Sequence, residues 1–313
     1  MVADADYTLA RYGEGSDKGL FFCLPEGTIP MTFRTLLVLI SALMPVTSHA
    51  LDAKWDPNAP LPFGVINQRS IALTAEYWNP ILAYVSRRSG VPLQLRMAKT
   101  APETTAMSVR GEFAFVYSNH LFTPERDALG FAVIARTEDN AIRGQIVVLE
   151  DSSLRTLTDL EGKEVAFPSQ EAFVGYQVPI AALDRTGVSV KAIFPGNQEA
   201  AISQLRFSKV AAAGVNDRVM ATYAEREGIR YRALYSSDPY QSIPIMAHPA
   251  VPAATRMKVQ AAFAGMMKDP EGAEILRVVS KTIGNTAASG FLASSHSDYE
   301  NYRHFYREAR AAR

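Results

Sequence analysis

The 313-residue chain contains a single cysteine, Cys23. One thiol forms no internal disulfide, and the chain after residue 50 has no cysteine to act as a metal ligand or nucleophile. The histidines do not indicate a metal site either, because no two of them have the sequence spacing of zinc ligands. They lie scattered along the chain, at His49, His120, His248, His296 and His304. We therefore expect no metal centre and no catalytic thiol.

Catalytic motifs and an excess of charge are missing as well. The sequence has no Gly-x-Ser-x-Gly elbow, no phosphate-binding loop with Gly-Lys-Ser/Thr and no Gly-x-Gly-x-x-Gly fingerprint. It holds 32 basic and 32 acidic residues; the first fifty residues account for three and five of these, which leaves 29 and 27. A balance this close to neutral argues against a nucleic-acid surface or polybasic membrane binding. We expect a binding protein that needs no cofactor and has no nucleic-acid partner, not an enzyme.

Long apolar runs are absent except near the start of the chain. Residues 31–50 read MTFRTLLVLISALMPVTSHA, with one basic residue, Arg34, before an apolar run from Leu36 to Met44. The segment ends in Ser48-His49-Ala50, the small-x-small pattern of a secretory signal cleavage site. The run is much shorter than the roughly 20 residues that cross a bilayer. The pattern predicts a cleaved signal peptide and a periplasmic protein, with a signal anchor that is not cleaved as the alternative.

A signal peptide acts only at the start of a nascent chain. We therefore expect translation to start at Met31. Residues 1–30 are then an upstream extension assigned in error, which should lie outside the fold. Cleavage after Ala50 would leave a mature protein of 263 residues, enough for one large domain or two lobes.

After residue 50, strand patterns alternate with helix patterns. Leu61 to Ile66 is a short apolar run typical of a buried strand, and a helix is predicted from about Ala75 to Arg88. Its residues Trp78, Ile81 and Leu82 are spaced to form one apolar face. Alternation of this kind predicts an α/β fold with parallel-rich sheets flanked by helices on both faces.

The alternation forms two sets and then returns to the first. We predict lobe 1 over residues 51–140 and 239–313, and lobe 2 over residues 141–238, with hinge crossings near 137–143 and 236–242. Further strands are expected over 91–97, 113–116, 131–136, 145–149, 164–167, 191–194, 209–215, 231–235 and 243–247. Further helices are expected from 100 to 109, 119 to 128, up to 183, 197 to 207, 217 to 227, 253 to 268, 270 to 280 and 297 to 309. The basic and aromatic stretch from Tyr302 to Arg310 is expected to be a solvated amphipathic terminal helix.

Polar and aromatic residues cluster where predicted strands end, and in such a fold the ligand cleft lies at these strand ends. Ser118, Asn119 and Asn216 have an alternative role as helix caps. Arg69 could bind an anion bidentately, although a surface arginine is the more common case. Phe173 has lobe-interface packing as its alternative, and we expect His120 to be a solvated loop residue. The candidate ligand contacts are Asn67, Arg69, Tyr77, Tyr117, Ser118, Asn119, Ser169, Gln170, Phe173 and Asn216.

Several short segments, in order, resemble periplasmic phosphonate-binding proteins, a branch of the solute-binding proteins of ABC transporters. The resemblance spans residues 61–300 and rests on Phe63–Ile66, Trp78–Leu82, Phe115–Asn119, Leu157–Phe167 and Gly175–Pro179. It implies the two-lobed type II periplasmic binding fold, a monomer that closes by hinge motion, and an ABC permease as partner. It also implies that Tyr117 faces the ligand, and it adds Tyr176 to the candidate contacts.

The chain departs from this family where the anion should bind. Phosphonate binders place a Ser-Thr-Ser run at a helix start, where hydroxyl and backbone N–H groups cradle the ligand oxygens. Here the matching residues are Ala172, Phe173 and Val174, and Phe113 stands where the family tends to have an Asp. We expect simple phosphonates and phosphate to bind poorly, and a small anion or zwitterion with some apolar bulk to bind instead.

Three functions fit the sequence. The first is capture of a ligand for an ABC importer. The second is a periplasmic sensor subunit of the same fold that signals to a membrane histidine kinase. The third is an enzyme of the related two-lobed fold that turns its ligand over.

Overall fold

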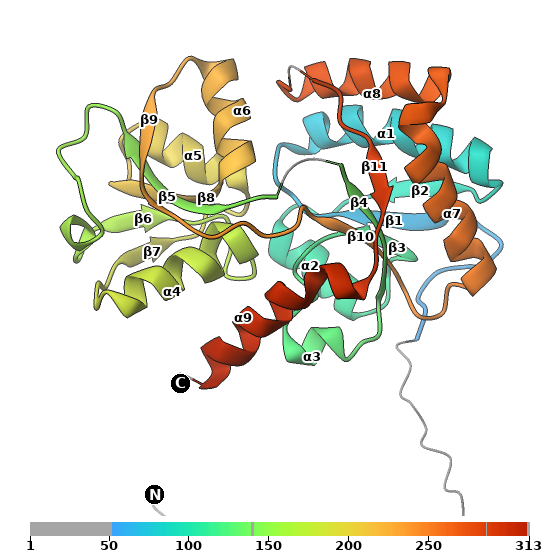
Figure 1. Ribbon diagram of the computed structural model, residues 1–313, viewed down its shortest axis with the longest axis horizontal. Helices are drawn as coiled ribbons and strands as arrows, with labels where there is room; N and C mark the ends of the chain where they lie inside the picture. The colour runs from blue at the N-terminus through green and yellow to red at the C-terminus, as the bar shows by residue number, and fades with distance from the viewer. Residues whose placement is uncertain (1–51, 139–140, 286, 312–313) are drawn as a thin grey trace, which may run out of the picture. The chain divides into compact units, whose positions relative to one another are not determined.

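The computed structural model describes residues 52–138, 141–285 and 287–311 (Figure 1). The predicted extension 1–30 and signal peptide 31–50 lie outside the described residues. A six-stranded sheet has the order β11-β4-β10-β3-β1-β2, and a five-stranded sheet has the order β7-β6-β8-β5-β9. Helices flank both sheets (Figure 1). Within the described residues, no helix has the length and apolar character that a membrane span requires.

The part of the chain around the six-stranded sheet is called the first lobe. Its elements before the first crossing are β1 (Leu61–Val65), α1 (Ile71–Ser89), β2 (Leu93–Arg96), α2 (Ala101–Val109), β3 (Phe115–Tyr117), α3 (Pro124–Asp127) and β4 (Ala132–Thr137). After the return crossing it gains β10 (Pro244–Ala247), α7 (Ala253–Gly265), η3 (Met266–Lys268), α8 (Pro270–Thr282), β11 (Phe291–Ala293), η4 (His296–Tyr299) and α9 (Glu300–Ala311).

The part around the five-stranded sheet is called the second lobe. It comprises β5 (Gly144–Leu149), η1 (Thr158–Leu160), β6 (Glu164–Ala166), η2 (Phe173–Gln177), α4 (Val178–Arg185), β7 (Lys191–Ile193), α5 (Gln198–Arg206), β8 (Ala212–Asn216), α6 (Asp217–Glu227) and β9 (Tyr231–Ser236). The η2 segment is a π-helix that leads directly into α4.

The sheets are mixed, which corrects the expectation that they are parallel-rich. Strands β1, β2 and β3 pair in parallel, as do β6, β7 and β8. The strands next to the crossings pair antiparallel: β10 with β3 and β4, and β5 with β8 and β9. The reason is that the chain enters these strands along a crossing and not through a covering helix, which is what parallel pairing needs.

The two crossings are joined to each other by a reciprocal backbone bridge. The Ile142 N–H donates to the Tyr240 carbonyl at 2.7 Å, and the Tyr240 N–H donates to the Ile142 carbonyl at 2.8 Å. Both segments that connect the lobes therefore run side by side as a short antiparallel pair.

Helix α1 shows how the sequence builds the first lobe. The Ser70 hydroxyl accepts from the Leu73 N–H at its start, and Gly90 ends the helix in the left-handed region at φ 67°. The predicted apolar face is confirmed, since Trp78, Ile81 and Leu82 are all buried in the core of this lobe. The predicted start at residue 75 is wrong by four residues, because the Ser70 cap was overlooked.

Three further local predictions differ from the structure. The helix expected over 119–128 is only the single turn α3, because residues 118–122 form a buried turn instead. The helix expected after residue 167 begins at Phe173 as the π-helix η2. Strand β11 was not predicted, since three residues between two helices give no periodic signal.

Candidate ligand-binding site

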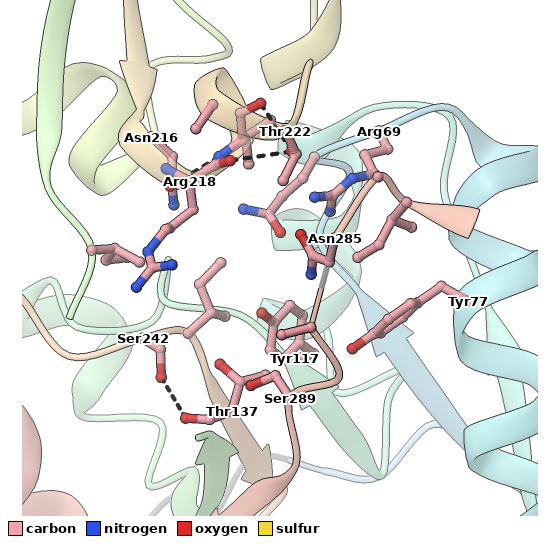
Figure 2. Close-up of a pocket in the computed structure, with 18 of the residues that line it drawn as sticks. Arg69, Tyr77, Tyr117, Thr137, Asn216, Arg218, Thr222, Ser242, Asn285 and Ser289 are labelled. Carbon is pink, nitrogen blue, oxygen red and sulfur yellow. Dashed lines mark hydrogen bonds between the residues drawn. The ribbon is translucent and has the colours of Figure 1, made fainter. Parts of the chain in front are cut away.

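A cavity of about 390 Å³ lies between the lobes at the crossings. The first lobe contributes the loop after β1, the N-terminal half of α1, the ends of β3 and β4 and the connection after α8. The second lobe contributes the end of β8 and α6. Polar and charged side chains dominate its wall (Figure 2). These include Gln68, Arg69, Tyr77, Tyr117, Thr137, Asn216, Arg218, Thr222, Glu225, Ser242, Asn285 and Ser289.

Arg69 is the cationic group set deepest in this wall. Its Nε atom is buried and has no hydrogen-bond partner among the described residues. Burial lowers the pKa of the Arg69 guanidinium, while the negative charge of Glu199 in the second lobe works in the opposite direction. A partly buried cation whose Nε donor is enclosed and unmet is costly, and an anion in the cavity would relieve that cost.

Arg218 faces the cavity from the second lobe. It lies in the first turn of α6, where the Asn216 side chain accepts from the N–H groups of Arg218 at 2.9 Å and Val219 at 3.4 Å. The side chain itself is exposed. Figure 2 shows the guanidinium groups of Arg69 and Arg218 entering from different sides of the cavity.

An aromatic wall completes the site on the first-lobe side. The ring of Trp78 lies 4.9 Å from that of Tyr117 and 5.5 Å from that of Tyr77, measured between centroids. Trp78 is buried in the core, whereas the two tyrosines are only partly buried and point into the cavity (Figure 2). The cavity thus combines two guanidinium groups and the Glu225 carboxylate with hydroxyl groups, amide groups and an apolar aromatic surface.

A second, much smaller cavity of about 20 Å³ lies where the expected cradle meets the first lobe. Its volume admits about one water molecule. Asn67, Asn119, Phe173 and Asn216 line it, so four of the predicted site residues meet here. Asn67 is already satisfied, because its amide donates to the Ala98 carbonyl at 2.9 Å and accepts from the Thr104 hydroxyl at 2.7 Å.

His120 also lines this small cavity, and the prediction that it is a solvated loop residue is wrong. The side chain is buried, and its Nδ1 lies 2.8 Å from the Thr105 hydroxyl. Since that hydroxyl donates to the Ala101 carbonyl at 3.0 Å, it accepts from a protonated Nδ1. Burial lowers the pKa of His120 to about 3, with the nearby positive charge of Arg126 adding to the effect. The imidazole is therefore neutral at ordinary pH.

Phe173 fills the space of the expected hydroxyl cradle with an aromatic cluster. Its ring stacks on Tyr302 of α9 at 4.1 Å between centroids, with an angle of 27° between the planes. Tyr240 and Phe305 contact it edge-on at 4.7 and 5.1 Å. Phe173 is 1% exposed, so its side chain belongs to an interior and does not line the large cavity.

Three predicted site residues line neither cavity. The Ser118 hydroxyl is buried and accepts from the His120 N–H at 3.1 Å, which is the local capping alternative. The Ser169 hydroxyl is buried without a hydrogen-bond partner among the described residues. Gln170 is exposed, and its carbonyl accepts from the Gln177 side chain at 2.5 Å.

Tyr176 also lies away from both cavities. Its ring makes edge-on contacts with Phe167 at 5.0 Å and Phe194 at 5.1 Å, inside the second lobe. Of the predicted residues, the structure therefore brings Arg69, Tyr77, Tyr117 and Asn216 together around the large cavity.

Several cavity residues were missed by the sequence reading. Arg218 lies two positions after the candidate Asn216, and a polar pattern at the start of a helix that follows a strand was the available signal. Asn285 and Ser289 belong to the connection between α8 and β11, for which the sequence analysis made no prediction of a binding role. Ser242 lies on the return crossing, where its hydroxyl donates to the Thr137 carbonyl at 2.9 Å (Figure 2).

The lobes touch directly beside the cavities. The Glu199 N–H at the start of α5 donates to the Gln68 carbonyl of the first lobe at 3.1 Å, and the Ala101 N–H donates to the Gly196 carbonyl at 3.3 Å. In the described part of the chain, no group of three or more His, Cys, Asp or Glu side chains is placed to hold a metal ion.

Comparison with known proteins agrees with this architecture. The structure superposes on PhnD1 of Prochlorococcus marinus in complex with methylphosphonate with a TM-score of 0.68 and 16% identity, covering 82% of this chain and 99% of that one. A binding-protein component of a phosphonate ABC transporter from Pseudomonas aeruginosa gives 0.65 and 16%, covering 79% and 85%. XAC2383 of Xanthomonas citri bound to chloride gives 0.63 and 17%, covering 81% and 99%. No curated protein matches the chain.

These similarities assign the fold to the type II periplasmic binding proteins. At the level of sequence, the family described as "ABC transporter, phosphonate, periplasmic substrate-binding protein" matches residues 63–299, about three quarters of the chain. This is a family of solute-binding proteins and not of enzymes, and its members work with a small ligand and an ABC transporter. The chain belongs to the family of periplasmic substrate-binding proteins of phosphonate ABC transporters.

Proposed function

We propose that this protein captures a small organic anion in the 390 Å³ cavity, with Arg69 as its main partner, and delivers it to an ABC importer. The observation that supports this most directly is the state of Arg69. Its Nε is buried with no hydrogen-bond partner, and it makes no ion pair within the described residues. Hydrogen bonds to charged groups contribute about 1.5–3 kcal/mol each, so an anion here would be held firmly.

The ligand is an anion or zwitterion with apolar or aromatic bulk. Tyr77 and Tyr117 offer ring surface next to Arg69, and the cavity falls in the range of about 300–1,000 Å³ typical of small-molecule sites. Methylphosphonate and inorganic phosphate would leave this aromatic surface uncovered. The cradle position cannot take them either, because Phe173 occupies it.

Binding closes the lobes on the ligand by hinge motion. Arg69 and Arg218 come from different lobes, so an anion that contacts both favours the closed arrangement. We propose residues 51–140 with 239–313, and residues 141–238, as the two moving bodies, and a monomer as the functional unit. The paired crossings at Ile142 and Tyr240 are a short connection about which such a motion can turn.

The ligand is best identified by native mass spectrometry of protein taken from its own periplasm. Calorimetry then compares inorganic phosphate, methylphosphonate, phenylphosphonate and benzoate as defined probes. We expect aryl anions to bind more tightly than phosphate, and Arg69→Gln to weaken them about ten- to hundredfold, the size of one charge-assisted hydrogen bond.

Arg230→Gln is the matched control, because this exposed arginine of the second lobe lines neither cavity. Unchanged affinity in Arg69→Gln would remove this residue from the site. Tight binding of methylphosphonate would show that the cradle still works despite Phe173.

A further inference from the structure

Helix α9 is fixed firmly to the first lobe. The Arg303 guanidinium donates to both carboxylate oxygens of Asp127, at 2.9 and 3.0 Å. The ring of Phe122 stacks on Tyr299 just before α9, 5.0 Å away with an angle of 12° between the planes. Arg303 is largely buried and bidentate, the geometry in which an ion pair contributes most.

The same segment holds the return crossing between the lobes. The Tyr299 hydroxyl donates to the Ser242 carbonyl and the Tyr302 hydroxyl to the Gln241 carbonyl, both at 2.6 Å. Two consecutive carbonyls of the crossing are thus occupied by the C-terminal part of the chain. Any turn of the second lobe about this crossing therefore acts against these hydrogen bonds.

The far side of α9 contacts the second lobe through Phe173. Tyr302, Phe305 and Tyr306 surround this ring at centroid distances of 4.1, 5.1 and 5.4 Å. Figure 1 shows α9 running from beneath the first lobe toward the second. Phe173, Tyr302 and Tyr306 are at most 9% exposed, so moving the lobes apart would bring buried aromatic surface into water.

We infer that Phe173 and Tyr302 are positioning residues that hold the two lobes together from outside the ligand cavity. Neither residue is among those that line the 390 Å³ cavity. Their stack adds to the stability of the closed arrangement whether or not an anion is bound. Because affinity depends on the fraction of protein in the binding-competent state, the stack raises affinity without touching the ligand.

The size of the effect follows from the contacts. An aromatic pair is worth about 0.5–1.5 kcal/mol beyond the area it buries, which corresponds to about a two- to tenfold change in the ratio of closed to open protein. This inference goes beyond the proposed ligand site, since it is expected to hold in protein freed of any carried ligand.

The test measures the distance between the lobes in the exported protein after refolding to remove carried ligand. The chain after residue 50 has no cysteine, so Lys163→Cys and Lys268→Cys give two unique spin-labelling sites. Both lysines are exposed and lie in different lobes. Pulsed electron resonance then reports the populations of short and long distances.

We expect Phe173→Leu to raise the ratio of long to short distances about two- to tenfold. Tyr302→Leu should raise it at least as much, and by more than Tyr302→Phe, which keeps the ring and loses only the hydrogen bond to the Gln241 carbonyl. Phe194→Leu is the matched control, because it removes an aromatic contact to Tyr176 within the second lobe alone. Near-ultraviolet circular dichroism checks that each variant is folded.

A distance distribution that is the same in folded Phe173→Leu, folded Tyr302→Leu and the parent would overturn the inference. An equal shift in Phe194→Leu would also overturn it, since general loosening of the second lobe would then explain the result. Neither outcome bears on the anion site, which is tested separately through Arg69.

Discussion

Two buried histidines should make the stability of this protein fall steeply in mild acid. His120 and His248 are 3% and 0% exposed. Burial lowers the pKa of His120 to about 3 and that of His248 to about 4, against 6.5 for the free side chain. His248 lies between Trp55 and Phe131, which contact its ring edge-on at 4.8 and 5.2 Å.

The sign follows from proton binding in the two states. Below pH 6.5 the unfolded chain binds protons at both imidazoles, whereas the folded protein does not until the pH approaches the lowered pKa values. Stability is therefore complete above pH 6.5 and is lost as the pH falls toward 4. At pH 5 each histidine should cost about 2 kcal/mol, and the pair about 4 kcal/mol, of the free energy of unfolding. That is a large share of the roughly 5–15 kcal/mol typical of a folded domain.

The assay is urea unfolding followed by circular dichroism at pH values between 5 and 7.5. We expect the free energy of unfolding in the parent protein to fall by about 2.4 kcal/mol per pH unit near pH 5.5, and His120→Gln to halve that slope. Thr105→Ala is the control, because it removes the hydroxyl partner of His120 but leaves the imidazole buried. It should lower stability at every pH with the slope retained.

The reasoning fails if His120→Gln keeps the full slope while remaining folded. Protonation of His120 in the folded state near pH 6 would then have to be possible, which requires water or an acceptor at Nε2. Titration of the two imidazoles by nuclear magnetic resonance measures the same pKa values directly and identifies which residue departs from expectation.

Two further predictions concern packing and processing. Gly64→Ala should destabilise the first lobe by about 1–3 kcal/mol, because the new Cβ would lie 2.6 Å from the buried Phe113 ring. The control is Gly265→Ala at the end of α7, where the new Cβ meets nothing within 4 Å. Equal free energies of unfolding for the two variants, measured in urea, would contradict the clash. Edman sequencing of the exported protein should begin at Leu51, and a start at any residue before Met31 would contradict the predicted signal peptide.

Much of the fold follows from local patterns that are complete within a few residues. The apolar face of α1 and the N-cap at Asn197, whose side chain accepts from the Ala200 N–H at 2.8 Å, were both readable in this way. The helix expected from residue 100 is α2, whose Thr100 hydroxyl accepts from the Glu103 N–H at 3.3 Å, while the Glu103 carboxylate accepts from the Lys99 N–H at 3.0 Å. Such signals identify elements but not how strands pair, which is why the antiparallel pairing next to the crossings was missed.

The site was less predictable because its residues are assembled across the whole chain. Arg69 and Tyr117 follow strands of one sheet, and the general rule that ligands bind at strand ends was enough to select them. Asn285 comes from a connection far along the sequence, and only the tertiary fold places it beside Arg69. No local pattern around it signals a binding role.

For the C-terminal helix, the sequence predicted the amphipathic pattern but not the packing of its aromatic face. Its amphipathic character was predicted, yet its aromatic face is not solvated: Tyr302 and Tyr306 are buried against Phe173. The alternative of lobe-interface packing for Phe173 describes this contact, but the sequence alone could not name its partner, which lies about 130 positions away. The sequence around Phe173 does not indicate a contact with Tyr302, and the sequence around Tyr302 does not indicate a contact with Phe173.

One position, Phe173, links the expected absence of a hydroxyl cradle to this aromatic contact. By the resemblance to phosphonate binders, Phe173 is expected to stand where they carry a hydroxyl run, and its ring is held by a helix that reaches across from the first lobe. Phe113, expected at the family's Asp position, is likewise buried, against Gly64. Of these two rings, only that of Phe173 lines the small cavity, whose volume is about 20 Å³. We propose that an anion between these lobes binds in the larger cavity, where Arg69 lies partly buried beside two tyrosines and its Nε donor has no hydrogen-bond partner among the described residues.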